Sequence, residues 1–248
     1  LFSLPLMASN ILQLLFNAAD IVVVGRFAGS ASLAAVSSTV SVINLFTQLL
    51  IGLSVGVNVV IARYLGLGGQ GKEISRTLHT AVLVAMVGGV ALGAVGILSS
   101  GWVLDLTGVP DDVRPLALVY MRIYFIGTPF TMLYNYGAAA LRAAGDTRRP
   151  LFFLLVSGMV NVVLNLISVI ALHMDAVGVA LATVISQAVS AVLVLLCLSQ
   201  TTGELHFAWS WLCLDKHRLL DMAHVGIPAG IQSCLFSLSN VVIQGAVN

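Results

Sequence analysis

The stretch Leu4–Gly25, LPLMASNILQLLFNAADIVVVG, decides the fold of this chain. It is almost entirely apolar, and a helix of this length, with a rise of about 1.5 Å per residue, crosses a hydrocarbon core of roughly 30 Å. One carboxylate, Asp20, lies inside it. Because an acid that faces lipid is costly, Asp20 is expected to face a partner or water.

The composition of the whole chain agrees with this first stretch. Hydrophobic residues make up 59% of the 248 residues and charged residues 8%, against about 45–50% and about 25% in soluble domains. The sequence therefore predicts an all-α membrane protein, a polytopic helical bundle with the lipid bilayer as its partner. A net charge of +1 gives no indication of a nucleic-acid partner. The predicted spans are Ser3–Val24, Val36–Ala62, Leu78–Val103, Pro115–Ala140, Leu151–Leu172, Ala176–Leu198 and a seventh that starts near Asp221.

Part of the first stretch is repeated in Ile227–Asn248, IPAGIQSCLFSLSNVVIQGAVN. Pro5 aligns with Pro228, whereas Asp20 aligns with Ile243, so the acid belongs to one copy only. Six spans bring the chain back to its starting side, which predicts a parallel repeat. We therefore expect a fragment of three parts: a six-helix lobe at 1–198, a cytoplasmic interfacial linker at 199–220, and the truncated first helix of a second lobe at 221–248.

The basic residues predict the orientation. The first, third and fifth connections carry only Arg26 and Arg114. Positive charge collects on the cytoplasmic side, so the N-terminus and the even connections are predicted to be cytoplasmic in a multi-pass protein of the bacterial inner (plasma) membrane. The even connections carry Arg63, Lys72, Arg76, Arg142, Arg148, Arg149, Lys216 and Arg218.

No catalytic motif is present. The sequence contains neither HExxH nor GxSxG, and its cysteines have no metal-binding spacing. Gly66–Lys72 (GLGGQGK) is similar to a phosphate-binding loop, but it follows a predicted span instead of a strand. The chain is therefore predicted not to be an enzyme and to need no cofactor beyond a coupling ion.

Polar residues inside the predicted spans are the candidates for function. Asn161 and Asn165 are four residues apart and share one helix face, as do Thr183 and Gln187. Hydrogen bonds between spans, worth about 0.6 kcal/mol each, explain any single amide. Asp20 in one span together with an Asn pair in another favours a hydrated cavity or a cation site.

Several motifs resemble the multidrug and toxin extrusion (MATE) family of secondary transporters, and they follow one another in the family's order along the whole chain. They are Asp20–Gly25, Leu33–Ala35, Gly52–Gly66 (GLSVGVNVVIARYLG), Leu141–Pro150 (LRAAGDTRRP), Asn161–Asn165 (NVVLN), Gly178–Gln187 (GVALATVISQ) and Gly226–Gln232 (GIPAGIQ). The resemblance implies twelve spans in two lobes around a central cavity. It also implies the export of cationic or amphipathic drugs and toxins by antiport with H⁺ or Na⁺, by a protein that is monomeric at full length.

The resemblance also implies a site. Asp20 matches the family's first-span carboxylate, Asn161, Asn165 and Thr183 match the other polar positions of the ion site, and Pro5 matches a helix bend. Asn165 departs from members that carry an aspartate there. Oxygens from these four side chains suit Na⁺ as a metal ligand set, whereas an isolated acid equally suits a proton.

Two alternatives come from other classes of protein. A lipid-linked oligosaccharide flippase of the same superfamily is expected to carry more Arg and Lys in its lobe, where this chain has only Arg122 near a span interior. The second alternative is a seven-helix receptor. The internal repeat argues against it, because a receptor does not need such a repeat.

Overall fold

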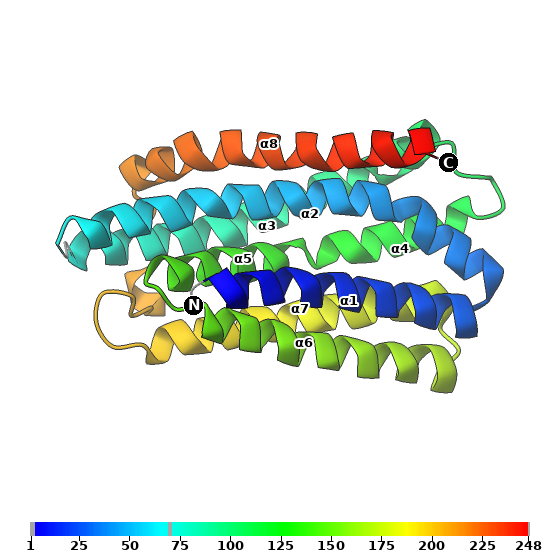
Figure 1. The fold of residues 1–248 in the computed structure, drawn as a ribbon, viewed down its shortest axis with the longest axis horizontal. Coiled ribbons are helices and arrows are strands. Elements are labelled where there is room, and N and C mark those ends of the chain that lie inside the picture. Colours follow the sequence, from blue (N-terminus) through cyan, green and yellow to red (C-terminus); the bar gives the residue numbers. More distant parts are fainter. Residues whose placement is uncertain (1–2, 69–70, 248) are drawn as a thin grey trace. The chain divides into compact units, whose positions relative to one another are not determined.

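The computed structural model describes the backbone of residues 3–68 and 71–247, and the side chains there except those of residues 3–6, 10, 14, 17 and 240–247. The described residues form helices and no strand (Figure 1). In chain order these are α1 (Ser3–Phe27), α2 (Gly29–Gly66), α3 (Gly71–Leu106), α4 (Arg114–Ile126), α5 (Thr128–Ala143), α6 (Arg148–Leu166), the π-helical turn η1 (Ile167–Ala171), α7 (Asp175–Gln200), the 3-10 turn η2 (Trp209–Trp211) and α8 (Lys216–Val247).

Six of the described helices are long and apolar enough to cross a membrane, and the bent pair α4–α5 adds a seventh if it is one span. This confirms the prediction of an all-α, polytopic membrane protein. The helices extend beyond the predicted spans: α2 begins at Gly29 and α8 at Lys216. Hydropathy marks only the apolar part of a helix, whereas the helix continues as long as its backbone hydrogen bonds do.

The predicted fourth span is not one straight helix. It breaks at Gly127 into α4 and α5, which are bent by 42°. Pro129 has no N–H, and its ring clashes with the carbonyl four residues earlier, so α4 cannot continue through it. A Cβ atom on Gly127 would lie 2.0 Å from Oε1 of Gln187 in α7, so glycine leaves the space that this side chain fills. The predicted Pro115–Ala140 span therefore corresponds to two helices with a break, which together are long and apolar enough for one span.

The chain divides into two compact units, each made of segments that are separated in the sequence. The first unit comprises residues 1–40, 90–130 and 151–190, and the second comprises residues 41–89, 131–150 and 191–248. The first contains α1, α4, α6, η1 and the first part of α7, and α1 contacts η1 within it. The predicted division of the chain at residues 198 and 220 stays a prediction.

In the second unit α8 packs against α2 through glycines (Figure 1). A Cβ atom on Gly52 would lie 2.4 Å from Cα of Gly230, and one on Gly56 would lie 2.1 Å from the carbonyl oxygen of Met222. The Gly52–Gly56 pair therefore allows the two backbones to touch, as GxxxG pairs do in membranes.

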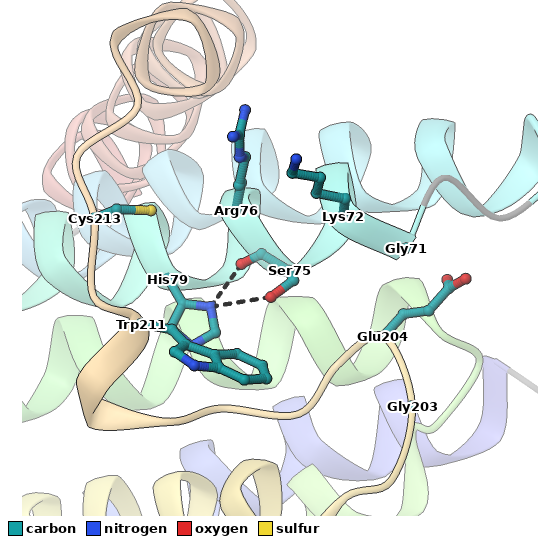
Figure 2. A pocket seen from close by; sticks show the side chains of 9 residues that line it. All are labelled: Gly71, Lys72, Ser75, Arg76, His79, Gly203, Glu204, Trp211 and Cys213. Carbon is teal, nitrogen blue, oxygen red and sulfur yellow. Dashed lines mark hydrogen bonds between the residues drawn. The ribbon is translucent and has the colours of Figure 1, made fainter.

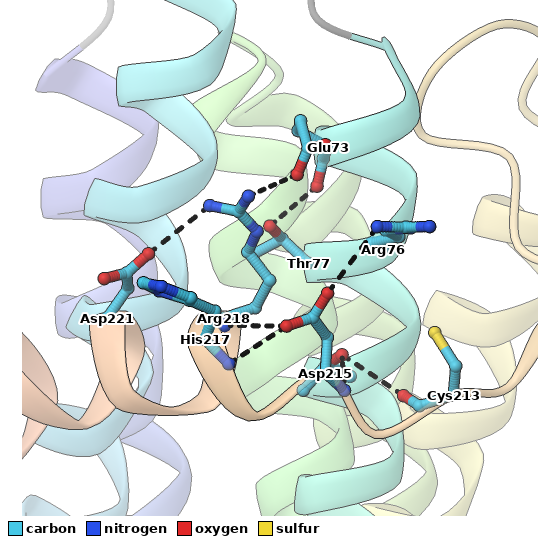
Figure 3. A network of polar contacts seen from close by, with 9 residues as sticks. Glu73, Arg76, Thr77, Cys213, Asp215, His217, Arg218 and Asp221 are labelled. Carbon is cyan, nitrogen blue, oxygen red and sulfur yellow. Dashed lines mark hydrogen bonds and ion pairs between the residues drawn. The ribbon is translucent and has the colours of Figure 1, made fainter.

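Arg218 joins the start of α8 to α2 and α3 in the second unit (Figure 3). Its guanidinium donates hydrogen bonds to Glu73 of α3 and, at 3.4 Å, to Asp221 of α8, and it lies 4.6 Å above the Tyr64 ring of α2. The Arg218 side chain is only 17% exposed, so these pairs are shielded from water more than ordinary surface pairs. Arg218 therefore fixes where α8 begins relative to α2 and α3.

The segment before α8 is also held against α3 (Figure 3). The Thr80 hydroxyl donates to the carbonyl oxygen of Cys213 at 3.1 Å and accepts the backbone N–H of Asp215 at 3.2 Å. Asp215 Oδ1 in turn accepts the backbone N–H groups of His217 and Arg218 at 3.0 and 3.3 Å. A side-chain oxygen that accepts these first N–H groups is an N-cap, which explains why α8 begins at Lys216.

The LRAAGDTRRP motif forms the turn between α5 and α6. Gly145 has φ +86°, a conformation that glycine adopts without strain, and Asp146 Oδ1 accepts the backbone N–H groups of Arg148 and Arg149 at 3.1 Å each. The Tyr134 hydroxyl donates to the carbonyl oxygen of Pro150 at 3.0 Å. The motif therefore has a local structural reason, namely a glycine turn followed by an aspartate cap.

Candidate functional site

Four predicted site residues come together in the first unit. Asp20 lies on α1, Asn161 and Asn165 lie on one face of α6, and Thr183 lies on α7. Asn165 Nδ2 donates to Asp20 Oδ1 and, at 3.1 Å, to Asn161 Oδ1. Asn161 Nδ2 donates to Thr183 Oγ1 at 3.4 Å, and the Thr183 hydroxyl donates to the carbonyl oxygen of Val179 at 2.9 Å. One hydrogen-bonded chain therefore links α1, α6 and α7.

This cluster is largely withdrawn from solvent. Asn165 is 1% exposed and Asn161 is 5% exposed, and Asp20 is half-buried. Asn165 Oδ1 is buried and accepts a hydrogen bond from no described residue. Among the described residues no basic side chain forms an ion pair with Asp20. An ionised carboxylate that accepts one amide hydrogen bond and has no cationic partner is costly in a low-dielectric place.

The oxygen atoms of these four side chains have the composition of a site for a hard monovalent cation or a proton. They comprise one carboxylate with amide and hydroxyl oxygens, and Asn165 Oδ1 is free to accept a further partner. Oxygen ligands suit hard cations. In the part of the chain described, no cluster of three or more His, Cys, Asp or Glu side chains is placed to hold a metal.

A glycine that the sequence reading missed sets the distance between α1 and α6. Gly158 lies one turn before Asn161, and a Cβ atom on it would lie 1.8 Å from Cε2 of Phe16. Phe16 lies one turn before Asp20, so the close approach at Gly158 brings Asp20 within reach of the Asn pair. A glycine inside an apolar span gives no signal of such a role in the sequence.

Two other features around the site were not predicted. Tyr120 of α4 is a buried hydroxyl-bearing side chain in the same unit. The π-helical turn η1 begins two residues after Asn165 and contacts α1. Such turns are frequent at functional sites, because they re-aim the side chains around them.

Gln187, paired with Thr183 in the sequence reading, lies one turn further along α7. Its Oε1 fills the space beside Gly127, and this oxygen and Oγ1 of Thr128 are buried without a hydrogen-bond partner among the described residues. The buried polar surface of the first unit therefore extends from Asp20 to the break between α4 and α5.

Pro5 is the third residue of the described part of α1. Its side chain lies outside the described residues, and its role as the helix bend stays a prediction. Pro228, its counterpart in the repeat, lies inside α8.

Comparison with known proteins gives a consistent set of relatives. The MatE family model matches residues 5–167. "Probable multidrug resistance protein YoeA" of Bacillus subtilis (strain 168) is 29% identical over 100% of this chain and 55% of its own length. The "FAD transporter" of Shewanella oneidensis is 27% identical over 98% of this chain and 54% of its own. The chain spans about half the length of the curated relatives it matches.

Solved structures agree with the sequence relatives. A crystal structure of MATE in complex with MaD3S has a TM-score of 0.87 and 25% identity, and the alignment covers 97% of this chain and 54% of that chain. The Shewanella relative is a transporter by name and YoeA is named a multidrug resistance protein, so neither is named as an enzyme.

Proposed function

Because this chain belongs to the MatE family of transporters, we propose that it forms part of a secondary transporter that exports cationic or amphipathic small molecules in exchange for H⁺ or Na⁺. The observation that supports the antiport step is the Asp20–Asn165–Asn161–Thr183 cluster. Membership of a transporter family argues against the alternative of a seven-helix receptor.

The coupling ion binds at Asp20 in this proposal. A half-buried carboxylate without a cationic partner is stabilised by a bound proton or a bound cation, and either one neutralises it. Asn165 donates a hydrogen bond to Asp20 Oδ1, and its own buried Oδ1 accepts none from a described residue. In this proposal the Asp20 carboxylate and Asn165 Oδ1 both serve as ligands of the ion.

Coupling requires that the ion distinguish two conformations of the transporter. A ligand shifts an equilibrium only by the difference between its affinities for the two states. Asp20, the Asn pair and Thr183 lie on three different helices, so a small movement between α1, α6 and α7 changes the oxygen set around the ion. Export of the substrate then follows the binding and release of the ion.

The proposed substrate class follows from the charge of the buried cluster. Asp20 gives it a negative charge, whereas Arg122, the basic residue nearest a span interior, is exposed. A negative interior favours cationic cargo and disfavours the pyrophosphate of a lipid-linked sugar. We also propose that the N-terminus is cytoplasmic and that the protein lies in the bacterial plasma membrane.

The test is ion-driven drug efflux from proteoliposomes that contain the protein expressed from the complete coding sequence. Asp20→Asn keeps the size of the side chain and removes its charge, so efflux under an imposed pH or Na⁺ gradient is expected to be lost. Asp105→Asn is the matched control, because Asp105 forms an exposed ion pair with Arg114 at 2.7 Å. Wild-type efflux by Asp20→Asn under both gradients would place the coupling site elsewhere.

A further inference from the structure

A cavity of about 600 Å³ lies in the second unit, between the first turns of α3 and the segment that connects α7 to α8 (Figure 2). Its walls include Lys72 and Arg76 from α3 and Glu204 and Trp211 from the connecting segment. None of these residues belongs to the ion site of the first unit. The cavity therefore shares no lining residue with the ion site.

The two basic side chains are available to a ligand. Lys72 and Arg76 are four residues apart and project from the same side of α3 (Figure 2). Among the described residues Lys72 has no ion pair, and the ion pair of Arg76 with Asp215 is long, at 3.9 Å. The Arg76 side chain is 47% exposed. Two neighbouring cations of this kind suit a phosphate group.

A carboxylate stands on the other side of the cavity. Glu204 Oε1 would lie 3.1 Å from a Cβ atom on Gly71, so this side chain rests against the first residue of α3. The lining therefore presents two positive charges and one negative charge. A ligand that carries both a phosphate and a positively charged group matches this arrangement better than a simple anion does.

Hydrogen bonds hold the connecting segment in place as one wall of the cavity. The two ring nitrogens of His79 are both engaged: Nδ1 with the carbonyl oxygen of Ser75 at 2.7 Å, and Nε2 with the backbone N–H of Ala208 at 3.1 Å. The His79 ring also stacks on Phe207 with 5.2 Å between centroids. His79 therefore holds the connecting segment against α3 as a wall of the cavity.

The cavity lies where membrane-spanning helices end. It is formed at the start of α3 and between the end of α7 and the start of α8, all of which are long enough to span. Trp209 and Trp211 beside it are each 57% exposed. Exposed tryptophans next to Lys and Arg at span ends are typical of the depth of lipid headgroups.

We propose that this cavity binds the headgroup of a phosphatidylethanolamine molecule of the membrane. The phosphate lies between Lys72 and Arg76, and the ammonium group lies at Glu204. Phosphatidylglycerol offers the same phosphate but no positive charge to Glu204, and phosphatidylcholine offers a positive charge without a hydrogen-bond donor. Both are therefore expected to bind more weakly than phosphatidylethanolamine.

Native mass spectrometry of the complete transporter, titrated with each of the three lipids, tests the proposal. The Lys72→Ala/Arg76→Ala variant is expected to bind phosphatidylethanolamine roughly thirtyfold more weakly, since each basic residue contributes a factor of about five to six. The control is Arg148→Ala/Lys216→Ala, which removes two exposed basic residues that do not line the cavity. Equal loss in the control would overturn the proposal.

Glu204→Gln separates the role of the ammonium group from that of the phosphate. It keeps the size of the side chain and removes its charge, so the preference for phosphatidylethanolamine over phosphatidylglycerol is expected to disappear while affinity for phosphatidylglycerol is retained. An unchanged preference would contradict the assignment of Glu204.

Soluble competitors distinguish a lipid from a free phosphate. Inorganic phosphate and glycerophosphoethanolamine at the same concentration as the lipid are expected to leave lipid binding unchanged, because they lack the acyl chains. Displacement of the lipid by inorganic phosphate would show that the cavity is a phosphate site and overturn the lipid assignment.

Discussion

A Cβ atom on Gly158 of α6 would lie 1.8 Å from Cε2 of Phe16 of α1. The backbone of one helix therefore meets the ring of the other, with no side chain from α6 between them. Phe16 is one turn from Asp20 and Gly158 is one turn from Asn161, so this contact sets the distance across which Asn165 bonds to Asp20.

Gly158→Ala is expected to lower the stability of the transporter by about 1–3 kcal/mol and to reduce efflux, because the added methyl forces α1 and α6 apart. Thermal unfolding and efflux both measure the effect. Phe16→Leu in the same variant should restore part of both, since it removes the atoms that clash. Gly101→Ala is the control, because no described atom beyond its own helix backbone and chain neighbours lies within 4 Å of the added methyl. Equal behaviour of the two alanine variants would contradict the argument.

Asn161 and Asn165 are each expected to contribute less to ion binding than Asp20, and Asn165 is expected to contribute more than Asn161. Asn165→Ala should weaken Na⁺ affinity about threefold, the value of one membrane hydrogen bond of about 0.6 kcal/mol, because Asn165 bonds to Asp20 itself. Asn161→Ala should weaken it less, because Asn161 bonds to Asn165 and Thr183 instead of Asp20. The ion dependence of efflux gives both values. The reverse order would mean that Asn161 contacts the ion directly.

Arg218→Lys is expected to destabilise the second unit by roughly 1–2 kcal/mol, because a lysine ammonium cannot pair with both Glu73 and Asp221 and stack on Tyr64. The melting temperature of the purified protein measures the loss. Arg76→Lys, at a half-exposed position with one long ion pair, should change the melting temperature little. An Arg218→Lys variant with an unchanged melting temperature would show that the Arg218 contacts add no stability.

The predicted orientation is tested by labelling with an impermeant thiol reagent added from outside the cell. In a background without Cys197, Cys213 and Cys234, Asp175→Cys should be labelled and Leu67→Cys should not be. Both positions are exposed in the structure, so accessibility within the protein does not decide the result. Labelling of Leu67→Cys alone would reverse the proposed topology.

The sequence by itself determined the fold class and nearly all of the spans. Apolar runs long enough to cross a bilayer leave a chain little choice, because each backbone N–H and C=O in hydrocarbon must be bonded within a helix. The sequence also singled out Asp20 and the Asn161–Asn165 pair, because polar groups inside such runs are costly unless they have partners. These are local properties, and they can be read from neighbouring residues.

Only the tertiary structure decided which of these side chains meet. The contact of Gly158 with Phe16, the position of Gln187 beside Gly127 and the π-helical turn after Asn165 depend on helices that are distant in the sequence. A glycine in an apolar span reads the same whether it faces lipid or another helix. The opposing backbone or side chain gives it its role, and that partner is fixed only when the helices pack.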